Sequence, residues 1–456
     1  MSKKLEITLL FIITPTLLTA NPASAESLIK NYTVAPRHQT YGVPSLGYPQ
    51  ICIRTNMPDQ RVDMEGILDE LSEKYHPTML LTESTKLAAS GKLGHVWTLF
   101  FDSENSWKSW SFRFPGTTTG NALFYKNWYD SPERNFNYQY CVSLKNQPTD
   151  EAYIVKNFVE PLVEESKQIA SALYPNIHFT NAVYSPATPC VWFATKLFNK
   201  VTGLDIPFEQ ELDWKKIANI INEPTFTTLK TIPDSGVVAE AISKKIKNSF
   251  PFDNNLNIMF TYNRDYLKFS NDKLLTILPV EFNSLGGSVL RPYFDKYKTS
   301  FLDDENLYLL DHRGNISLFN IWTKKFDYQD LPMNQVLNNL SFDPKSIRAT
   351  MPIYFNMPHY IDSVNQYLVF LENGDTYLMN STKKELRKVD YFQRYAPHLV
   401  PYTKRIQGIS LANDNHVMVY LSDRKYIEVD LASLAIVGQE TPLEDHPSLG
   451  HYFKLH

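Results

Sequence analysis

The stretch SPATPCVWFATKLFNKVTG, residues 185–203, carries start and stop signals for a helix. Thr188 is predicted to be the N-cap, and Pro189 fits the first helical position. Gly203 is expected just past the C-terminus, because glycine readily adopts the left-handed conformation found there. Phe193, Leu197 and Val201 recur every four residues, so one face of this helix is predicted to be buried.

Cys190 falls in the first turn of this helix, where free backbone N–H groups point outward and the helix dipole is positive. Such a position favours a thiolate over a thiol, which is the condition for a nucleophilic cysteine. The alternative is a small buried residue that only packs.

Composition bounds the class of protein. The chain has 456 residues, enough for two or three domains, and its net charge of −4 excludes the strongly basic proteins that bind nucleic acid. An aromatic content of 13% and few glycines favour a sheet-rich structure. No motif predicts a cofactor, and the cysteine spacing excludes zinc-type pairs. His446, His451 and His456 fit either a metal site or a solvated tail.

The first residues predict an export signal. A basic start, Met1 to Lys4, precedes an apolar run from Ile7 to Leu18 and the small-residue site Ala23-Ser24-Ala25. We therefore expect residues 1–25 to be removed, and a periplasmic or secreted protein beginning at Glu26. No later stretch is long and apolar enough to predict a transmembrane anchor.

Export makes a disulfide chemically permissible. Of the three cysteines, Cys52 and Cys141 lie in β-like segments, and pairing them would leave Cys190 free. The alternative is that both stay reduced as small buried residues.

Periodicity predicts strands at 94–101, 107–114 and 138–144, and helices at 64–75, 149–173, 209–222 and 237–248. Beyond about 250 the pattern becomes β-rich, and four strand–turn–strand stretches align. Their turn positions are Arg264, Gly314, Gly374 and Arg424, at intervals of 50, 60 and 50 residues. That spacing is close to the length of a four-stranded propeller blade. Unrelated hairpins in a β-sandwich are the alternative.

A nucleophilic thiolate needs a base, and His95 is the candidate because it opens a strongly β segment directly after Gly94. The Gly-His-Val-Trp opening at 94–97, Ser-Trp-Ser-Phe at 109–112, a long helix, and Pro-Cys-Val-Trp-Phe-Ala-Thr at 189–195 together resemble circularly permuted papain-like enzymes. These are the NlpC-type amidase and lecithin–retinol acyltransferase-like group, and the resemblance covers about residues 50–205.

The resemblance implies an α+β permuted papain-like domain at residues 26–205, with Cys190 as nucleophile and His95 as base. It places the residue that orients His95 on the following strand, where Ser111 and Ser109 are the candidates, although the family more often uses His, Asn, Gln or an acid there. Either a serine serves weakly, or the orienting residue comes from elsewhere in the chain, or the enzyme has degenerated. A helical connector at 206–250 and a propeller-like domain at 251–456 complete the expected organisation.

Two classes of function remain open. The first is an exported cysteine hydrolase of the amidase or peptidase type, or an acyltransferase, which acts through an acyl-enzyme. Its substrate would be a peptide, a peptidoglycan stem peptide or another acyl compound. The second is a non-catalytic binding protein whose propeller-like half recognises a protein or glycan ligand.

Overall fold

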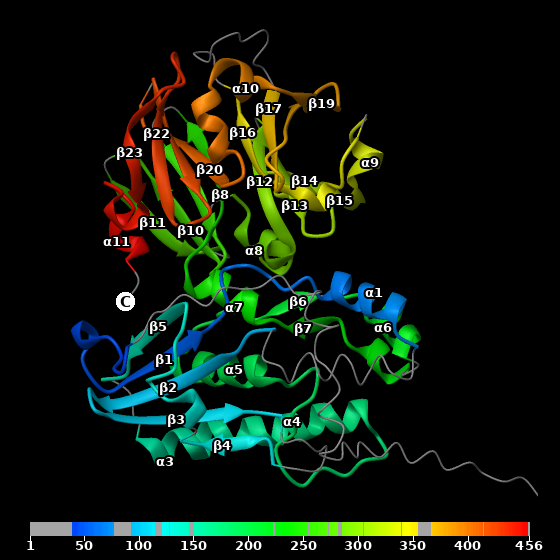
Figure 1. Cartoon of the computed structure of the whole chain (residues 1–456), viewed down its shortest axis with the longest axis vertical. Coiled ribbons are helices and arrows are strands. Elements are labelled where there is room, and N and C mark those ends of the chain that lie inside the picture. Colours follow the sequence, from blue (N-terminus) through cyan, green and yellow to red (C-terminus); the bar gives the residue numbers. More distant parts are fainter. Residues whose placement is uncertain are drawn as a thin grey trace, which may run out of the picture. The chain divides into compact units, whose positions relative to one another are not determined.

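The chain consists mostly of β-sheet and divides into two compact units, one ending at Ser243 and the other beginning at Lys244. Figure 1 shows the computed structural model. It describes residues 39–76, 93–114, 121–126, 128–145, 150–221, 224–253, 256–271, 273–280, 285–303, 305–338, 340–353, 366–413 and 415–454. The expected signal at residues 1–25 lies outside these ranges. We call the two parts the N-terminal and the C-terminal unit.

The N-terminal unit contains a five-stranded antiparallel sheet in the order β4-β3-β2-β1-β5. Its strands are β1 (Gln50–Thr55), β2 (Val96–Ser103), β3 (Ser106–Phe112), β4 (Leu123–Tyr125) and β5 (Tyr138–Ser143). Cys52 lies directly opposite Cys141 in the β1–β5 register, and a disulfide joins them. Of the two alternatives for these cysteines, the structure has the bridged one.

Helix α5 (Cys190–Thr202) packs against one face of this sheet. Its apolar side chains, spaced as the sequence predicts, meet the alternate residues of β1, β2 and β3 that point the same way. The ring of Phe112 on β3 stacks on Phe193 of α5 at 4.2 Å between centroids. This contact fixes the start of α5 relative to the sheet.

The helix expected at 149–173 is interrupted, as Pro161 predicts. It consists of α3 (Glu151–Ile154), a π-helical turn η5 (Val155–Val159) and α4 (Glu160–Leu173). Proline cannot donate the backbone bond that a regular helix requires, and the wider turn lies just before it. Asp150 caps the first segment by accepting from the N–H of Tyr153. Thr149, where the sequence predicts the helix to begin, lies outside the described residues.

The segment 206–243, expected to be a connector, belongs to the N-terminal unit. It forms β6 (Glu209–Glu211), α6 (Trp214–Ile221), a 3-10 helix η6 (Pro224–Thr228), β7 (Thr231–Pro233) and α7 (Ser235–Ile242). The helix predicted at 237–248 therefore starts and ends earlier. Asp234 caps α7 by accepting from the N–H of Gly236, and the left-handed Lys244 (φ 54°) turns the chain into a strand. Elsewhere in this unit α1 spans Met64–Lys74, and short 3-10 helices occupy Pro44–Leu46 and Trp128–Asp130 (η4).

The C-terminal unit consists of four antiparallel sheets of four consecutive strands each, a propeller-like arrangement. Blade 1 contains β8 (Ile246–Asp253), β9 (Leu256–Thr261), β10 (Asp265–Phe269) and β11 (Leu274–Pro279). Blade 2 contains β12 (Tyr297–Asp303), β13 (Asn306–Asp311), β14 (Asn315–Asn320) and β15 (Lys325–Pro332). Blade 3 contains β16 (Ile347–Pro352), β17 (Gln366–Leu371), β18 (Thr376–Asn380) and β19 (Glu385–Val389). Blade 4 contains β20 (Ile406–Leu411), β21 (His416–Leu421), β22 (Lys425–Asp430) and β23 (Ile436–Pro442).

The aligned turn positions of the sequence repeat are structurally equivalent. Arg264, Gly314, Gly374 and Arg424 all have positive φ, between 64° and 91°, and each joins the second strand of a blade to the third. Only a few conformations reverse a hairpin so tightly, so the four blades share one turn geometry. The repeat register inferred from the sequence is thus the register of the blades.

The first strands of the four blades, β8, β12, β16 and β20, form a ring in which β20 again contacts β8. Polar side chains link neighbours in this ring: Asn248 donates to Ser300, and Thr350 donates to the Ser300 carbonyl. At the closing contact, Gly408 approaches Ser249 so closely that a Cβ would lie 2.5 Å from its backbone nitrogen. Glycine is therefore required there.

The short helices of the C-terminal unit connect or cover the blades: α8 (Gly287–Leu290), η8 (Arg291–Lys296), α9 (Met333–Val336), η9 (Pro344–Ser346), α10 (Tyr391–Tyr395), η10 (Pro397–Tyr402), η11 (Leu443–Asp445) and α11 (Gly450–Phe453). Residues of η11 and α11 fill a core between blades 4 and 1. The Tyr452 hydroxyl donates to Asp265 on β10 at 2.7 Å, which ties this last segment to blade 1.

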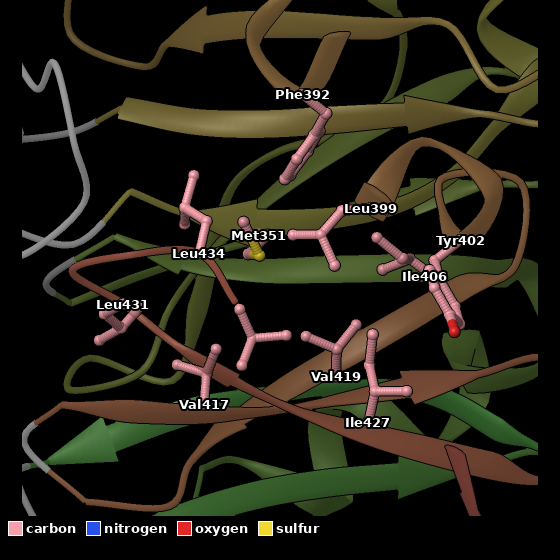
Figure 2. Close-up of a pocket in the computed structure, with 11 residues that line it drawn as sticks. Met351, Phe392, Leu399, Tyr402, Ile406, Val417, Val419, Ile427, Leu431 and Leu434 are labelled. Atoms are coloured by element: carbon pink, nitrogen blue, oxygen red, sulfur yellow. The ribbon is translucent and has the colours of Figure 1, made fainter. Parts of the chain in front are cut away.

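An apolar cavity of about 30 Å³ lies between blades 3 and 4. Figure 2 shows its lining, in which Met351 and Leu399 face Val417, Val419 and Ile427. That room suits one or two water-sized molecules, yet almost no polar group is present to bind them. We assign it to imperfect packing between two blades. Within the described ranges, no helix has both the length and the apolar character needed to cross a bilayer.

Candidate active site

Cys190 is the first residue of α5, one position nearer the helix start than expected. Pro189 occupies the cap position with extended backbone, and no side chain caps the helix. Thr188 was expected to do so, but its hydroxyl is used within the preceding loop, where it donates to the Val183 carbonyl and bonds Ser185. The first N–H groups of α5 therefore remain directed toward the space beside Cys190.

His95 is held at the start of β2 by its own backbone. Its N–H donates to the Asn56 side chain at 2.7 Å, and its carbonyl accepts from the Asn56 N–H. Gly94, with φ +82°, makes the turn into the strand, and a Cβ there would lie 2.0 Å from Met57. The His95 ring stacks on Trp97, with 5.6 Å between centroids. The base candidate is thus fixed at both backbone and ring.

Cys190 and His95 meet in space, as predicted, and their side chains hydrogen-bond. Burial raises the pKa of the Cys190 thiol, but the His95 charge and hydrogen bond, with a further bond from the Val96 N–H, outweigh burial and bring the pKa below its ordinary value. Burial likewise opposes the charged imidazole, yet Asp130 and Cys190 raise the pKa of His95 to about 9. At neutral pH His95 is therefore an imidazolium, and its charge favours the thiolate form of Cys190.

Asp130, which the sequence reasoning missed, is the orienting partner of His95. Its Oδ1 lies 2.8 Å from His95 Nε2 and accepts from Arg134 at 2.9 Å. The carboxylate is fully buried, which raises its pKa, but the charges and bonds of His95, the charge of Arg134 and a bond from Ser111 hold the pKa at about 2. Asp130 ends η4, in a turn-rich segment without periodicity to mark it.

The candidates Ser111 and Ser109 do not take the orienting role expected of them. Both are buried on β3, the predicted strand, and Ser111 lies beside Asp130, one step removed from the imidazole. Ser109 uses its backbone carbonyl to accept from the N–H of Lys126 at 2.7 Å. A carboxylate in contact with the ring stabilises an imidazolium more strongly than a neutral hydroxyl can, which explains why the acid is found there.

Arg54 fixes the loop that carries Asp130. This fully buried guanidinium donates to the Pro132 carbonyl at 2.8 Å and to Gln139 at 2.7 Å, and lies 4.3 Å from the centre of the Phe136 ring. It also donates to the carbonyls of Gln39 and Tyr41. Burial lowers its pKa to about 9, so these contacts hold a charged group at neutral pH. The loop is thereby attached to β1 and β5.

Tyr184 places a polar group beside Cys190. Its hydroxyl lies within hydrogen-bonding reach of both the sulfur and the backbone N–H of Cys190. Burial and the neighbouring thiolate raise the pKa of Tyr184 well above its ordinary value, so the hydroxyl keeps its proton. It can donate that proton in a hydrogen bond to an oxygen bound next to Cys190. The ring is positioned by an edge contact with Phe114.

No described part of the chain gathers three or more His, Cys, Asp or Glu side chains suited to a metal ion. Of the C-terminal histidines, His446 is neither a ligand of such a group nor solvated. It is buried, and its ring accepts from the N–H groups of Ser448 and Leu449. His451 is exposed, and His456 lies outside the described residues.

Comparison with known proteins gives only fold likenesses. No family model and no curated protein matches the sequence. The hemopexin-fold protein CP4 from cow pea is similar over 46% of this chain and 98% of its own, with 14% identity and a TM-score of 0.36. A plant albumin from Cicer arietinum described as showing hemagglutination has 15% identity over 46% of this chain and 99% of its own, TM-score 0.36. The RRP9 WD40 repeats match at 7% identity over 42% and 50%, TM-score 0.21.

Proposed function

We propose that this protein is an exported cysteine hydrolase of the amidase or peptidase type, with a permuted papain-like N-terminal domain. The observation that carries the proposal is the chain of contacts from Cys190 to His95 to Asp130. A nucleophile, a base and a group that orients the base are the three parts that acyl transfer through a thiol requires. The order of elements, a His-bearing strand before a Cys-bearing helix, supports the permuted arrangement.

In the proposed reaction the Cys190 thiolate attacks the carbonyl carbon of an amide or ester, and the carbonyl π pair moves onto oxygen. The Cys190 N–H and the Tyr184 hydroxyl donate to that oxyanion. His95 gives its proton to the leaving nitrogen or oxygen as the old bond breaks, which leaves a thioester on Cys190. A water then attacks the thioester while His95 takes its proton, and the thiolate returns with release of the acid.

Arg113 indicates which substrates fit. Its guanidinium lies 4.0 Å from the centre of the Tyr129 ring and close enough to Tyr184 to lower that hydroxyl's pKa. Among the described residues no carboxylate forms an ion pair with it. A positioned, half-buried guanidinium binds carboxylates well. The proposed substrates therefore carry a carboxylate near the scissile carbonyl, as peptidoglycan stem peptides and other peptide ends do.

The proposal is tested by trapping the acyl-enzyme. An activated ester such as p-nitrophenyl acetate should give a burst of about one nitrophenol per wild-type chain, with an acetyl group on Cys190 in intact-mass and peptide spectra. Cys190→Ala should abolish both. The second assay uses amide substrates: stem peptides whose carboxylates are either free or amidated. Arg113→Gln should raise KM for the peptides with free carboxylates and leave KM for the amidated peptides unchanged. Arg387→Gln, an exposed change on β19, is the control.

Adding an amine or alcohol acceptor distinguishes an acyltransferase, because the thioester would then partition to the acceptor. An unreactive Cys190 would leave the non-catalytic binding protein as the remaining interpretation.

A further inference from the structure

Tyr129 and Phe124 are two exposed aromatic side chains of the N-terminal unit. The Tyr129 ring is 46% exposed, and the Arg113 guanidinium carbon lies 4.0 Å from its centre. Phe124 is 40% exposed and belongs to β4, the strand at one edge of the five-stranded sheet. Single exposed aromatic residues are common, whereas several that lie together beside a charged group mark a binding surface. The relative positions of these three side chains decide which case applies.

The register of the sheet places Phe124 beside Arg113. Phe124 lies directly opposite Ser111 on β3. The pairing continues one residue past the end of β3, where the Arg113 N–H donates to the Ala122 carbonyl at 2.9 Å. Residues that face each other across two strands, and those two positions along, point to the same side of a sheet. Phe124 and Arg113 are therefore diagonal neighbours on one face, a separation of about 7–8 Å that long and aromatic side chains span.

This group adjoins the candidate active site on the side of His95. Tyr129 directly precedes Asp130, whose carboxylate oxygen lies 2.8 Å from His95 Nε2. In the proposed reaction His95 gives its proton to the leaving nitrogen, so the leaving group lies next to the imidazole. Side chains beside Asp130 therefore flank the leaving group.

Arg113 also adjoins the proposed oxyanion donor. It directly precedes Phe114, whose ring makes an edge contact with the Tyr184 ring, with 6.1 Å between centroids. Arg113 thus lies between the loop of Tyr129 and the tyrosine beside Cys190. When the last amide of a peptide is cleaved, the leaving nitrogen and the terminal carboxylate are attached to one carbon. A guanidinium in this position is placed to bind that carboxylate.

We propose that Phe124, Tyr129 and Arg113 form a subsite for a C-terminal residue that has an aromatic or large apolar side chain and a free carboxylate. This inference rests on the proposed hydrolase function and narrows its substrates to peptide ends of that kind. The side chain and the carboxylate of a terminal residue branch from the same carbon, so their binding groups must be adjacent. The two exposed rings and the guanidinium meet that requirement.

The residue bound in this subsite is the one released. The Cys190 sulfur replaces the amide nitrogen at the scissile carbonyl carbon, and the electron pair of the broken C–N bond stays on nitrogen, which takes the His95 proton. The terminal residue leaves as a free amino acid. Water then replaces sulfur at the same carbon, which restores the thiolate and returns a proton to His95.

The test uses acetyl-Gly-Gly-X peptides in which X is phenylalanine, leucine, alanine or phenylalanine amide, and measures the release of X. Wild-type kcat/KM for phenylalanine should exceed that for alanine by at least about tenfold, and the amide should lose about as much. Phe124→Ala and Tyr129→Ala should each reduce the ratio of phenylalanine to alanine to less than about threefold. Trp322→Ala, which removes an exposed aromatic ring from the C-terminal unit, is the matched control and should keep the wild-type ratio.

Failure of the subsite and failure of the proposed function give different results. A wild type that forms the acetyl adduct on Cys190 but cleaves the phenylalanine and alanine peptides equally, or cleaves neither, overturns the subsite alone. A wild type that forms no adduct and cleaves no peptide overturns both. Because the preference of the wild type is measured without any substitution, the test holds even if Phe124→Ala does not fold. A loss of the ratio in Trp322→Ala as large as in Phe124→Ala would also contradict the subsite.

Discussion

Asp130 Oδ1 and His95 Nε2 lie 2.8 Å apart, although the two residues are 35 positions apart in sequence, Asp130 at the end of η4 and His95 directly before β2. The same oxygen accepts from Arg134, so the carboxylate remains ionised while it contacts the ring. It therefore stabilises the imidazolium that pairs with the Cys190 thiolate. The proposed reactivity of the cysteine would thus depend on an acid that it does not touch.

Asp130→Asn should reduce kcat by roughly 10²- to 10⁴-fold, the usual contribution of a correctly protonated acid–base group. The amide removes the negative charge that raises the pKa of His95, so the pKa of His95 should fall and that of Cys190 should rise. Titration by NMR and iodoacetamide rates at several pH values measure both. Asp102→Asn, the same change at an exposed position on β2, should alter neither.

Cys190→Ala should abolish acyl-enzyme formation while changing the free energy of unfolding by less than about 1 kcal/mol, since alanine suits the first turn of a helix. The pKa of His95 should decrease, because the thiolate contributes to raising it. Denaturant unfolding measures the change in stability, and mass spectrometry measures acyl-enzyme formation. A Cys190→Ala protein that still forms an acetyl adduct at the site would contradict the assignment.

Tyr184→Phe should lower kcat by about 10²-fold and leave KM nearly unchanged, because a donor to the oxyanion acts mainly in the transition state. The thiol should still react with iodoacetamide, since that reaction develops no oxyanion. Tyr153→Phe on α3 offers a matched control at an exposed tyrosine. Equal losses of alkylation and turnover in Tyr184→Phe would point to a structural role instead.

The activity should fall on the alkaline side with an apparent pKa near 9, where His95 loses the proton needed by the leaving group. The folded pKa lies above the ordinary 6.5, so the charged ring stabilises the fold fully below pH 6.5. This contribution is lost as the pH rises through about 9. In Asp130→Asn the alkaline loss of activity should occur at lower pH than in the wild type. If it occurs at the same pH, a group other than His95 controls it.

Reducing the Cys52–Cys141 disulfide should destabilise the N-terminal unit by about 2–4 kcal/mol, because the bridge closes a long loop, with a sequence separation of 89. Denaturant unfolding with and without dithiothreitol measures this, and the Cys52→Ala/Cys141→Ala double variant should unfold like the reduced wild type. If the double variant matches the oxidised protein instead, the bridge adds no stability.

Short sequence patterns predicted the structural features that depend on neighbouring residues. The structure has three features that depend only on residues close together in sequence. They are the apolar face of α5, the alternation of β3 and the hairpin turns at Arg264 and Gly314. The pairing of Cys190 with His95 followed from chemical need combined with a family resemblance. Thr188 does not cap the helix because its hydroxyl bonds Ser185 and Val183. Those partners come within reach because the loop before the helix folds back on itself.

Asp130 could not be found in the same way. Nothing in the turn-rich segment around it distinguishes a carboxylate that will be buried from one that will be solvated. Its role depends on Arg54, distant in sequence, fastening the loop to the sheet. The bounds of the helix expected at 237–248 were wrong for a related reason. Lys244 has left-handed backbone, and a lysine in the sequence does not predict that conformation.

Each blade of the C-terminal unit pairs only its own consecutive strands, while the seam between blades 4 and 1 is filled by η11 and α11. During synthesis, each blade can thus pair its strands as soon as it leaves the ribosome. The ring gains its last packing contacts only once residues up to Phe453 have emerged. Until then, a hydrophobic surface that includes Met259, Leu267 and Tyr420 lacks its cover, so we expect a nascent chain stalled before Leu443 to be exposed to chaperones and proteases.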